Sequence, residues 1–522
     1  MKNQEIINKY LTKNHRPKIS TNLITFEVAT ENILELCVKF YQMDKLPLKT
    51  IKAVDTRSDD GCFKIFYIFA VPGENVFLAP FIRLEKTTKF PSLVNKIYEA
   101  NCYEMEIQSF FGLTAVGHSN QQQFILHGNW PKDVFPLRKD FKWDKRPQTA
   151  NVPYKFQTIA GEGIYQIPVG PIHAGIIEPG HFRFSVAGEE IVFLEPQLGF
   201  VHKGSEKLFE TLELTDKLKL SERISGDTSF SHSLAFCQAV ETLGNITVPA
   251  RAEFLRVIYS ELERLANHLN DTGYIINDTA FNTLGSIGTR LREQTMQICE
   301  RLTKSRFLRG VNTIGGVTKD IDEQEANSLA AELKIIQKDY ADFLDIAQGS
   351  EIVQNRLKTT GILTLQTALD HGVVGIAARA VGLEIDARIE YPYAAYEKIG
   401  FKMARQETGD VYARFMIRAE EIETGIDIIL KALKIMPKGK IINKTQLTLA
   451  KDSATISITE GWRGDIVYFV TTDTKGEISR VGVRDASFLN WPAVPYAVIG
   501  NIVPDFPLIN KSFNLSYSGF DR

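Results

Sequence analysis

The strongest constraint on the fold is a long helical pattern in the second half of the chain. Apolar side chains recur there at steps of three, four or seven residues, at Val411, Phe415, Ile422, Ile426, Ile429 and Leu433. These steps place them on one face of an α-helix, which predicts a helix buried along one stripe. A second helical pattern covers residues 251–269 and opens at Pro249, because the missing N–H of proline costs nothing in a first helical turn. The second half of the chain is therefore expected to be mainly helical.

The first 142 residues show a different pattern. Helical spacing over residues 30–42 precedes two apolar runs. These runs cover residues 63–71 and 76–82, and Pro72-Gly73 between them predicts the turn of a β-hairpin. A short amphipathic helix is expected over residues 100–112, where it ends at a glycine. Together these signals predict a small α/β domain over residues 1–142.

A polar and basic stretch over residues 143–155 predicts a linker, and residues 156–522 form the second predicted domain. Alternating runs in this domain predict antiparallel strands near both of its ends. They lie at residues 165–171, 182–194, 466–472 and 478–483. The predicted fold class is α+β, with a small α/β domain followed by a mostly α-helical domain that has small β-sheets near its start and end.

The composition narrows the classes of function. Of 522 residues, 44% are hydrophobic, and 61 basic against 63 acidic side chains leave a net charge of −2. A chain with so little net charge has no field that favours nucleic acid or anionic lipid, so nucleic-acid binding is disfavoured. The longest apolar stretch, residues 361–385, is broken by Asp370, His371 and Arg379, which are costly inside a bilayer. No transmembrane helix is therefore predicted.

The five cysteines are scattered along the chain without a Cys-x-x-Cys pair. This pattern argues against a zinc or iron–sulfur site bound by a local motif, and it fits a reducing compartment. The start of the chain, residues 1–6, lacks the apolar core of a signal peptide. We therefore expect a peripheral location at the cytoplasmic face of the cell membrane, with any membrane association made through partner subunits.

Two segments far apart in the sequence carry the clearest indication of function. Residues 222–232 read Glu-Arg-Ile-Ser-Gly-Asp-Thr-Ser-Phe-Ser-His, and residues 512–522 read Ser-Phe-Asn-Leu-Ser-Tyr-Ser-Gly-Phe-Asp-Arg. They resemble the two nickel-binding motifs of nickel-iron hydrogenase large subunits, Arg-x-Cys-Gly-x-Cys-x-x-x-His and Asp-Pro-Cys-x-x-Cys-x-x-Arg. The resemblance places both segments at one site.

Every thiolate position of these motifs has lost its sulfur. Ser225 and Thr228 stand at the first pair of cysteines, and Ser516 and Gly519 stand at the second pair. A thiol with a pKa of about 8.5 is readily converted into a metal-bound thiolate, whereas an alcohol is not, and glycine has no side chain. We therefore expect no metal on this chain. The vestigial nickel-site positions are Ser225, Thr228, Ser516 and His232, the last of which ends the first motif.

Further motifs in a fixed order extend the resemblance over nearly all of residues 165–522. They lie at residues 170–184, 197–208, 409–421, 462–465 and 490–492. In this order they resemble the large subunit of membrane-bound, energy-converting hydrogenases and the 49 kDa subunit of respiratory complex I. The segments at residues 100–112 and 130–141 are similar to the 30 kDa subunit of complex I. A fusion of both parts resembles the large subunits of the formate hydrogenlyase and hydrogenase-4 type.

The resemblance implies a subunit of a complex I-like oxidoreductase. Electrons would arrive through an iron–sulfur small subunit, and redox or protonation changes would pass to proton-pumping membrane subunits. No cofactor is expected on this chain, and the iron–sulfur cluster is expected in the partner. The Arg-x-Asp-Tyr motif of the complex I branch, which supplies a quinone-contacting tyrosine, reads Arg223-Ile-Ser-Gly226 here.

Two hypotheses about the vestigial cavity stay open. In the first, the cavity accepts a quinone or another small acceptor. In the second, the chain is a non-catalytic structural or coupling subunit, and the cavity has collapsed around Ser225, Thr228 and Ser516. Hydrogenase activity is disfavoured under both hypotheses.

Three further residues are candidates for the polar groups of the cavity. On spacing alone Glu178 and His181 fit a solvated turn, whereas the resemblance places them at the cavity with a carboxylate that passes protons. Arg463 corresponds to a cavity-facing cation of the family, or else to a surface residue in a Trp-Arg-Gly-Asp turn. A buried arginine without a partner would cost several kcal/mol, so a carboxylate such as Glu178 is expected beside it. His232 either contacts the occupant of the cavity or is a satisfied core residue.

Overall fold

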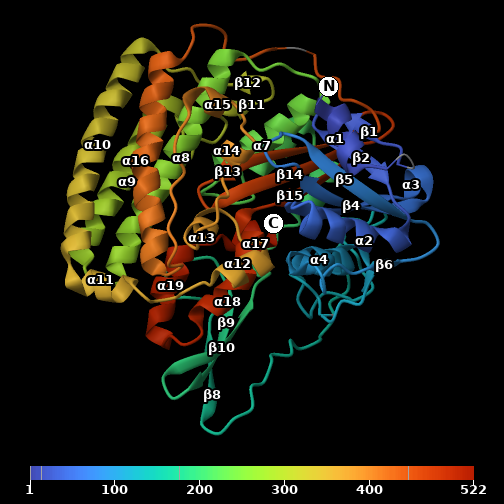
Figure 1. Cartoon of the computed structure of the whole chain (residues 1–522), viewed down its shortest axis with the longest axis horizontal. Coiled ribbons are helices and arrows are strands. Elements are labelled where there is room, and N and C mark those ends of the chain that lie inside the picture. The colour runs from blue at the N-terminus through green and yellow to red at the C-terminus, as the bar shows by residue number, and fades with distance from the viewer. Residues whose placement is uncertain (1, 13–14, 121, 176, 445) are drawn as a thin grey trace.

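The computed structural model describes residues 2–12, 15–120, 122–175, 177–444 and 446–522. Figure 1 shows long helices along one side of the molecule, a sheet at its centre and the amino-terminal domain on the other side. A narrow sheet extends away from this body. The arrangement confirms the predicted α+β class, with an α/β region followed by a mainly helical one.

The amino-terminal region is built on a five-stranded sheet in the order β1-β2-β5-β4-β3. Its strands are β1 (Lys18–Ser20), β2 (Leu23–Glu27), β3 (Leu48–Thr56), β4 (Cys62–Ala70) and β5 (Phe77–Leu84). The predicted hairpin is confirmed, because β4 and β5 pair antiparallel. The helices of this region are α1 (Lys2–Tyr10), α2 (Ile33–Val38), α3 (Arg57–Asp60) and α4 (Asn101–Phe111), and β6 (Lys89–Pro91) pairs with β7 (Thr114–Val116). As predicted, α4 ends at Gly112, which adopts a φ of 65°.

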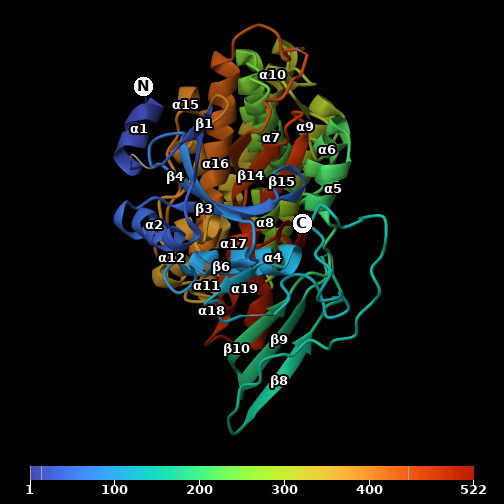
Figure 2. The same ribbon diagram turned by 90° about the vertical axis from the view of Figure 1, so that its right-hand side faces the viewer.

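The second region starts with an antiparallel sheet in the order β10-β9-β8. Its strands are β8 (Ile164–Val169), β9 (His181–Ala187) and β10 (Glu190–Gln197), which confirms the strands predicted there. Figure 2 shows this sheet extending from the end of the molecule. Between Val116 and Ile164 the described residues form no helix or strand. The domain boundaries at residues 142 and 156 stay a prediction.

Four long helices form the bulk of the second region, and they are α8 (Ala250–Asn277), α9 (Asn282–Thr303), α10 (Glu323–Gly349) and α16 (Val411–Ile435). Both predicted helices are confirmed, and α8 begins directly after Pro249. Helices α8 and α9 approach closely where glycines face each other. A Cβ on Gly288 would lie 2.6 Å from the Cα of Gly273, so only glycine allows this crossing. Among the described helices none combines the length and the apolar composition needed to cross a bilayer.

Shorter elements surround this bundle. The helices are α5 (Ser205–Thr211), α6 (Leu214–Ser221), α7 (Ser229–Leu243), α11 (Glu351–Leu357), α12 (Leu365–His371), α13 (Gly375–Arg379), α14 (Ala387–Glu390), α15 (Tyr396–Ile399), α17 (Ala486–Asn490), α18 (Val494–Val498), α19 (Phe506–Phe513) and α20 (Tyr517–Asp521). Two short strands, β11 (Asn312–Thr313) and β12 (Gly316–Val317), pair with each other.

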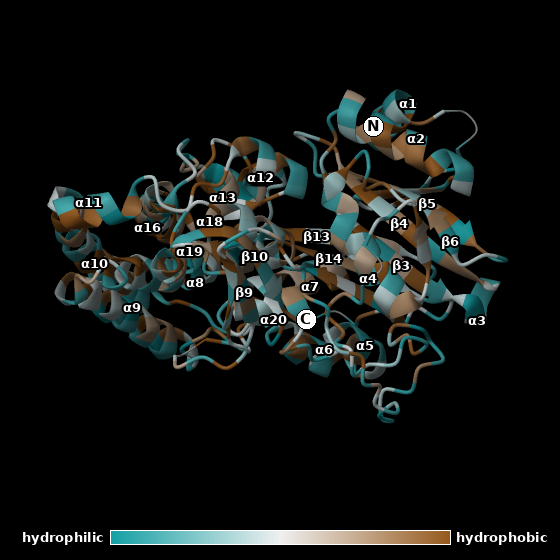
Figure 3. Cartoon of the chain, turned by 90° about the horizontal axis from the view of Figure 1, so that it is seen from below, coloured by the Kyte–Doolittle hydropathy of each residue, from teal (hydrophilic) through white to brown (hydrophobic). Residues whose placement is uncertain are grey.

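The strands predicted near the end of the chain form a sheet at the centre of the molecule. It consists of β13 (Ala454–Gly461), β14 (Gly464–Thr472) and β15 (Ile478–Arg484). Every residue of β14 is buried, and Figure 3 shows these strands as predominantly apolar while α9 and α10 display hydrophilic residues. The ring of Phe66 on β4 lies 5.2 Å from the ring of Phe469 on β14, so the central sheet packs against the amino-terminal sheet.

Buried ion pairs fix the carboxyl terminus between the two regions. Arg522 pairs with Glu106 of α4 at 3.2 Å and with Glu206 of α5 at 3.4 Å. Lys52 of β3 pairs with the same two carboxylates. Breaking a buried pair by removing one partner costs about 3–5 kcal/mol, so this network holds the end of the chain firmly in place.

Candidate functional site

The two sulfur-free motifs meet in the folded chain. The hydroxyl oxygens of Ser225 and Ser516 lie 2.8 Å apart and form a hydrogen bond, although the residues are 291 positions apart in the sequence. Ser225 lies in the turn before α7, and Ser516 caps the amino terminus of α20 by accepting a hydrogen bond from the backbone N–H of Gly519. Both side chains are buried. The geometric part of the sequence interpretation, one site built from both motifs, is therefore confirmed.

A carboxylate and a guanidinium lie beside these hydroxyls. Arg463 donates two hydrogen bonds to Asp227, at 2.8 and 2.7 Å. Ser225 and Thr228 donate to the same carboxylate at 2.9 and 3.0 Å. Burial alone would raise the pKa of Asp227, but Arg463 and the hydroxyls hold it below its usual value. The Asp227 side chain is still 39% exposed, against 6% for Arg463, so the pair lies at the edge of the site.

The carboxylate expected beside Arg463 is present, but it is Asp227 and not Glu178. Glu178 is exposed in the loop between β8 and β9, and its carboxylate accepts a hydrogen bond from the backbone N–H of Ser518 at 2.9 Å. The nearer carboxylate is Asp227, which precedes Thr228 in the same motif as Ser225. Glu178 is connected to the site through Ser518, whose hydroxyl lies 3.2 Å from that of Ser516.

His181 lies apart from both groups. It is the first residue of β9, its Nδ1 lies 3.1 Å from the carbonyl oxygen of Gly170, and its ring packs near Phe156. Its Nε2 is buried and has no hydrogen-bond partner among the described residues. The structure therefore does not bring Glu178, His181 and Arg463 into one constellation, and a role for each in catalysis stays a prediction.

His232 is a satisfied core residue, one of the two alternatives that the sequence left open. It is fully buried, with Nε2 3.1 Å from a carboxylate oxygen of Asp485 and Nδ1 3.1 Å from the hydroxyl of Tyr468. A carboxylate only accepts, so the Nε2–H donates to Asp485, and Nδ1 forms the second hydrogen bond with the Tyr468 hydroxyl. Burial alone would raise the pKa of Asp485, but His232 and the other partners of this carboxylate lower the pKa below its usual value.

Asp485 also fills the position of the fourth lost thiolate. A Cβ placed on Gly519 would lie 2.7 Å from the Asp485 carboxyl group, closer than side-chain atoms pack. Asp485 cannot easily move, because it caps α17 by accepting from the N–H of Ser487 and also contacts His232. A cysteine at position 519 therefore does not fit this arrangement.

The residues at the site do not fit a nickel-iron centre. Hydroxyls replace three thiolates, two of those hydroxyls bond directly to each other, and a carboxylate takes the space of the fourth. Soft metal ions require deprotonated sulfur ligands. Across the part of the chain that the structure describes, no group of three or more histidine, cysteine, aspartate or glutamate side chains could hold a metal ion.

The hydroxyls instead form a continuous hydrogen-bonded chain. It runs from Ser518 to Ser516 at 3.2 Å, to Ser225 at 2.8 Å and to Asp227 at 2.9 Å. Because a hydroxyl both donates and accepts, such a chain can pass a proton from group to group. Glu178 contacts the outer end through the backbone of Ser518. The arrangement can relay protons and can hold one negative charge beside Arg463.

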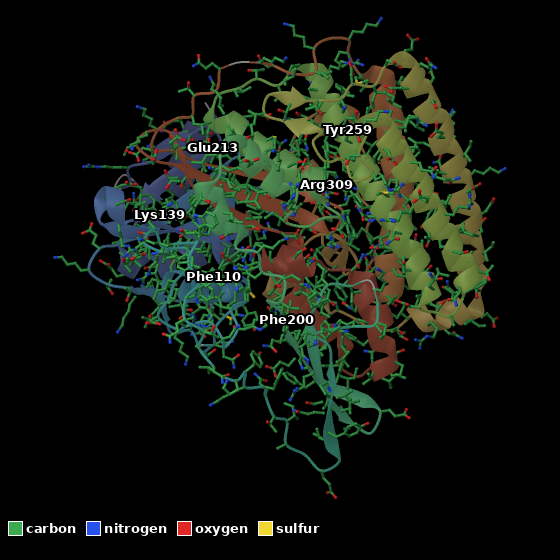
Figure 4. The ribbon with its side chains drawn as sticks, turned by 180° about the vertical axis from the view of Figure 1, so that it is seen from behind. Phe110, Lys139, Phe200, Glu213, Tyr259 and Arg309 are labelled. Atoms are coloured by element: carbon green, nitrogen blue, oxygen red, sulfur yellow. The ribbon has the colours of Figure 1, made fainter. Side chains whose placement is uncertain are left out.

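Arg309 covers the outer side of the first motif and was not identified from the sequence. Its guanidinium donates to the carbonyl oxygen of Gly226 at 3.4 Å and to the hydroxyl of Ser229 at 3.3 Å. Figure 4 labels Arg309 on the rear face, near the middle of the molecule. No pattern near residue 309 indicates this role, because the contact joins segments 80 and more residues apart.

Comparisons with known proteins support the resemblance that the motifs indicate. Two family models match the chain: the respiratory-chain NADH dehydrogenase 49 Kd subunit over residues 278–457 and 445–522, and the 30 Kd subunit over residues 26–147. Hydrogenase-4 component G of Escherichia coli (strain K12) is 31% identical over 489 residues, which cover 92% of this chain and 85% of that protein. The chain belongs to the family of complex I 49 kDa subunits and hydrogenase large subunits.

Two other members of this family align with this chain over a similar length. Formate hydrogenlyase subunit 5 of Escherichia coli (strain K12) is 30% identical over 478 residues, covering 90% of this chain and 83% of that protein. NADH-quinone oxidoreductase C/D of Phocaeicola vulgatus is 29% identical over 475 residues, covering 86% of this chain and 90% of that protein. The resemblance indicated by the motifs is confirmed, including the part similar to the 30 kDa subunit. The chain is therefore a subunit of the oxidoreductase complexes that this family forms.

Proposed function

We propose that this chain is a nickel-free coupling subunit of a membrane-associated, complex I-like oxidoreductase. Electrons move through an iron–sulfur cluster in a small partner subunit, and this chain responds by moving protons and charge toward ion-translocating membrane subunits. The observation that carries the proposal is the direct hydrogen bond between Ser225 and Ser516. In this proposal, that contact closes the space in which the motif resemblance would place the metal of the family's hydrogenases.

The charges of the site support this role. Removing both metal ions and four thiolates takes away positive and negative charge together. What remains beside the hydroxyls is the Asp227–Arg463 pair, which is neutral as a whole, and the Asp485 carboxylate, which contacts His232. An ion pair with an exposed edge responds to a nearby change of charge, because the pKa of its carboxylate depends on the local field. The chain of serine hydroxyls supplies a route for the proton that such a change would move.

The proposed partners are an iron–sulfur small subunit and proton-pumping membrane subunits, and the proposed place is the cytoplasmic face of the cell membrane. The family membership and the names of the relatives support this assembly. Isolation of the complex from its native source, followed by identification of its subunits, tests it. Copurification of an iron–sulfur protein and of membrane proteins is expected, and a chain recovered alone under gentle conditions would contradict the assembly.

The absence of nickel is tested by metal analysis of the same preparation. Iron from the partner's cluster is expected, together with nickel far below one ion per chain. Because iron and nickel are measured in one sample, low nickel cannot be ascribed to general loss of metal. A nickel content near one per chain would overturn the proposal.

A second candidate function is binding of a quinone or another small acceptor at the outer edge of the site. The 39% exposure of the Asp227 side chain beside Arg463 favours it, since a polar headgroup could reach this pair from outside. Asp227→Asn in the intact complex tests it. Acceptor reduction that falls at least tenfold, with an elevated KM and intact assembly, would favour this function. An unchanged KM would rule out acceptor binding at this pair, and the coupling role would then be the remaining proposal.

A further inference from the structure

A dense cluster of buried charges lies behind the turn that carries Arg463. Its members come from α8, α13, α14, α16 and β13 and from the residue that caps α14, and each is at most 3% exposed. They are Arg264, Arg379, Arg388, Glu261, Glu421, Glu460, Asp386 and His268. None of these residues belongs to the vestigial nickel site. The proposed function does not use them.

Every carboxylate of the cluster is held by several partners. Glu421 accepts from Arg379 at 2.8 Å and from Arg388 at 3.1 Å, and it lies 2.7 Å from Nε2 of His268. Glu460 accepts from Arg379 and from the backbone N–H of Ala387, both at 3.0 Å. The cluster is therefore one connected network, because Arg379 joins Glu421 to Glu460.

The remaining two carboxylates complete this network. Glu261 accepts from Arg388 at 3.1 Å, from Arg264 at 3.2 Å and from the hydroxyl of Tyr396 at 2.6 Å. Asp386 pairs with Arg388 at 2.7 Å. Each of the four carboxylates therefore has a guanidinium partner.

The fixed charges of the network do not balance. Among the described members, three guanidinium groups face four carboxylates, so one negative charge is left over in the interior. An uncompensated buried charge costs several kcal/mol, and a group in that position binds a proton instead. Two members can take this proton, Glu460 and His268. Burial, followed by the charge of Asp386, raises the pKa of Glu460 to about 7, while burial lowers the pKa of His268.

Other ionisable groups around Glu460 are accounted for. Asp465 opposes it across the β13–β14 pair and is held by Arg484 and Lys49. The hydroxyl of Tyr393 accepts from the backbone N–H of Glu460. The other charged groups that act on Glu460 are Arg264, Arg379 and Asp386, which are members of the cluster. The charge of Asp465 favours the protonated form of Glu460, whereas the positive charges of Lys49 and Arg484 beside Asp465 act in the opposite direction.

We propose that this cluster is a proton-binding site that holds one exchangeable proton near neutral pH, carried by Glu460, with His268 as the alternative acceptor across the Arg379–Glu421 bridge. The cluster contacts the turn that carries Arg463, and this turn connects it to the vestigial site. Arg264 donates to the carbonyl oxygens of Glu460 and Gly461, and the ring of His268 lies edge-on to Trp462 at 6.2 Å. Trp462 stacks on the Arg463 guanidinium at 3.8 Å. A change of protonation in the cluster therefore alters the electric field at the Asp227–Arg463 pair.

Infrared difference spectra of the purified complex across neutral pH test the proposal. The C=O band of a protonated carboxylic acid is expected to disappear as pH rises through about 7, and this change should be missing in Glu460→Gln. Glu104→Gln is the matched control, since Glu104 is another buried carboxyl with a pKa raised to about 7 in a different region. It should remove a separate band and leave the Glu460 band in place.

A second variant keeps the proposal testable if Glu460→Gln does not fold. His268→Gln keeps an N–H group near Glu421 but cannot take up the proton, so the Glu460 band should strengthen and persist to higher pH. An identical spectrum in wild type and both cluster variants would overturn the proposal. So would a band that is insensitive to pH, because the proton would then not exchange. Neither result depends on nickel content or on acceptor reduction, so failure here is distinct from failure of the proposed function.

Discussion

The two sides of the β13–β14 turn differ sharply in how they carry charge. On the Arg463 side, neutral hydroxyls lie beside one ion pair that is partly open to solvent and beside the buried Asp485 carboxylate. On the Glu460 side, eight ionisable residues form a closed network within the protein. If the site holds no metal, as proposed, neutral hydroxyls can stand at three of the four ligand positions, because no metal charge is left for those positions to balance. Charges that balance one another cannot be removed singly without a large cost.

Breaking the closed network is expected to give the largest effect. Glu421→Ala removes the carboxylate shared by Arg379, Arg388 and His268, and it should lower the free energy of unfolding by about 3–5 kcal/mol. Denaturant unfolding followed by circular dichroism measures this. Glu420→Ala is the matched control on the same helix, because Glu420 is partly exposed and accepts only from Gln406. A loss of about 1 kcal/mol is expected there.

The pH dependence of stability should have opposite signs on the two sides. The folded pKa of Glu460 is raised to about 7 from 4.5, so its contribution is full below pH 4.5 and is lost as pH rises through about 7. The loss is on the order of 3 kcal/mol and should vanish in Glu460→Gln. Unfolding midpoints recorded across this pH range would show it. A wild-type profile that matches the variant would contradict the comparison.

For Asp227 the pH dependence of stability is expected to have the opposite sign. Its folded pKa is lowered below 3.8, so its contribution is present at neutral pH and is lost as pH falls through the acid range. The side chain is 39% exposed, so solvent reduces the effect. Asp227→Asn should therefore change stability only slightly and only above the acid range. A stability loss in Asp227→Asn that persists at acid pH would show that the side chain acts through packing.

A side chain added at position 519, the fourth thiolate position, should lower the free energy of unfolding by less than a break in the charge network does. Gly519→Ala forces Asp485 away from His232 or shifts α20, at about 1–3 kcal/mol. Gly349→Ala serves as the control, because a Cβ there meets no atom within 4 Å, and no loss is expected. Equal effects of the two substitutions on the unfolding midpoint would show that Asp485 does not occupy the thiolate position.

The smallest effect is expected at the hydroxyl pair. Ser225→Ala and Ser516→Ala should each cost about 1 kcal/mol, the second partly through loss of the helix cap at Gly519. A double-mutant cycle on the unfolding free energy isolates the hydrogen bond between them. A coupling energy of about 0.5–1.5 kcal/mol is expected. A value near zero would mean that the two hydroxyls do not interact in solution.

Local patterns allowed most of the fold to be predicted. The periodicity over residues 411–433 and the Pro72-Gly73 turn depend on neighbouring residues, and both elements were confirmed. The meeting of Ser225 and Ser516 was also predicted, but only because two motifs of one family supplied the long-range information. Periodicity alone could not have joined segments so far apart.

The contacts between segments could not be predicted in the same way. Asp485 and Tyr468 lie 253 and 236 residues from His232, and neither belongs to a motif. A carboxylate partner such as Glu178 was expected for Arg463, and in the fold this partner is Asp227, whereas Glu178 contacts Ser518. Buried charges such as Glu460 look like surface residues in the sequence, because their burial follows from tertiary packing alone.

The central claim is that hydroxyls and a carboxylate fill the space of the lost metal. A high-resolution cryo-electron microscopy map of the assembled complex tests it most directly at Ser225 and Ser516. The account predicts that the two hydroxyl oxygens remain in hydrogen-bond contact, close to 2.8 Å, with no density between them. Side chains pushed apart by density for an ion or an acceptor would contradict it.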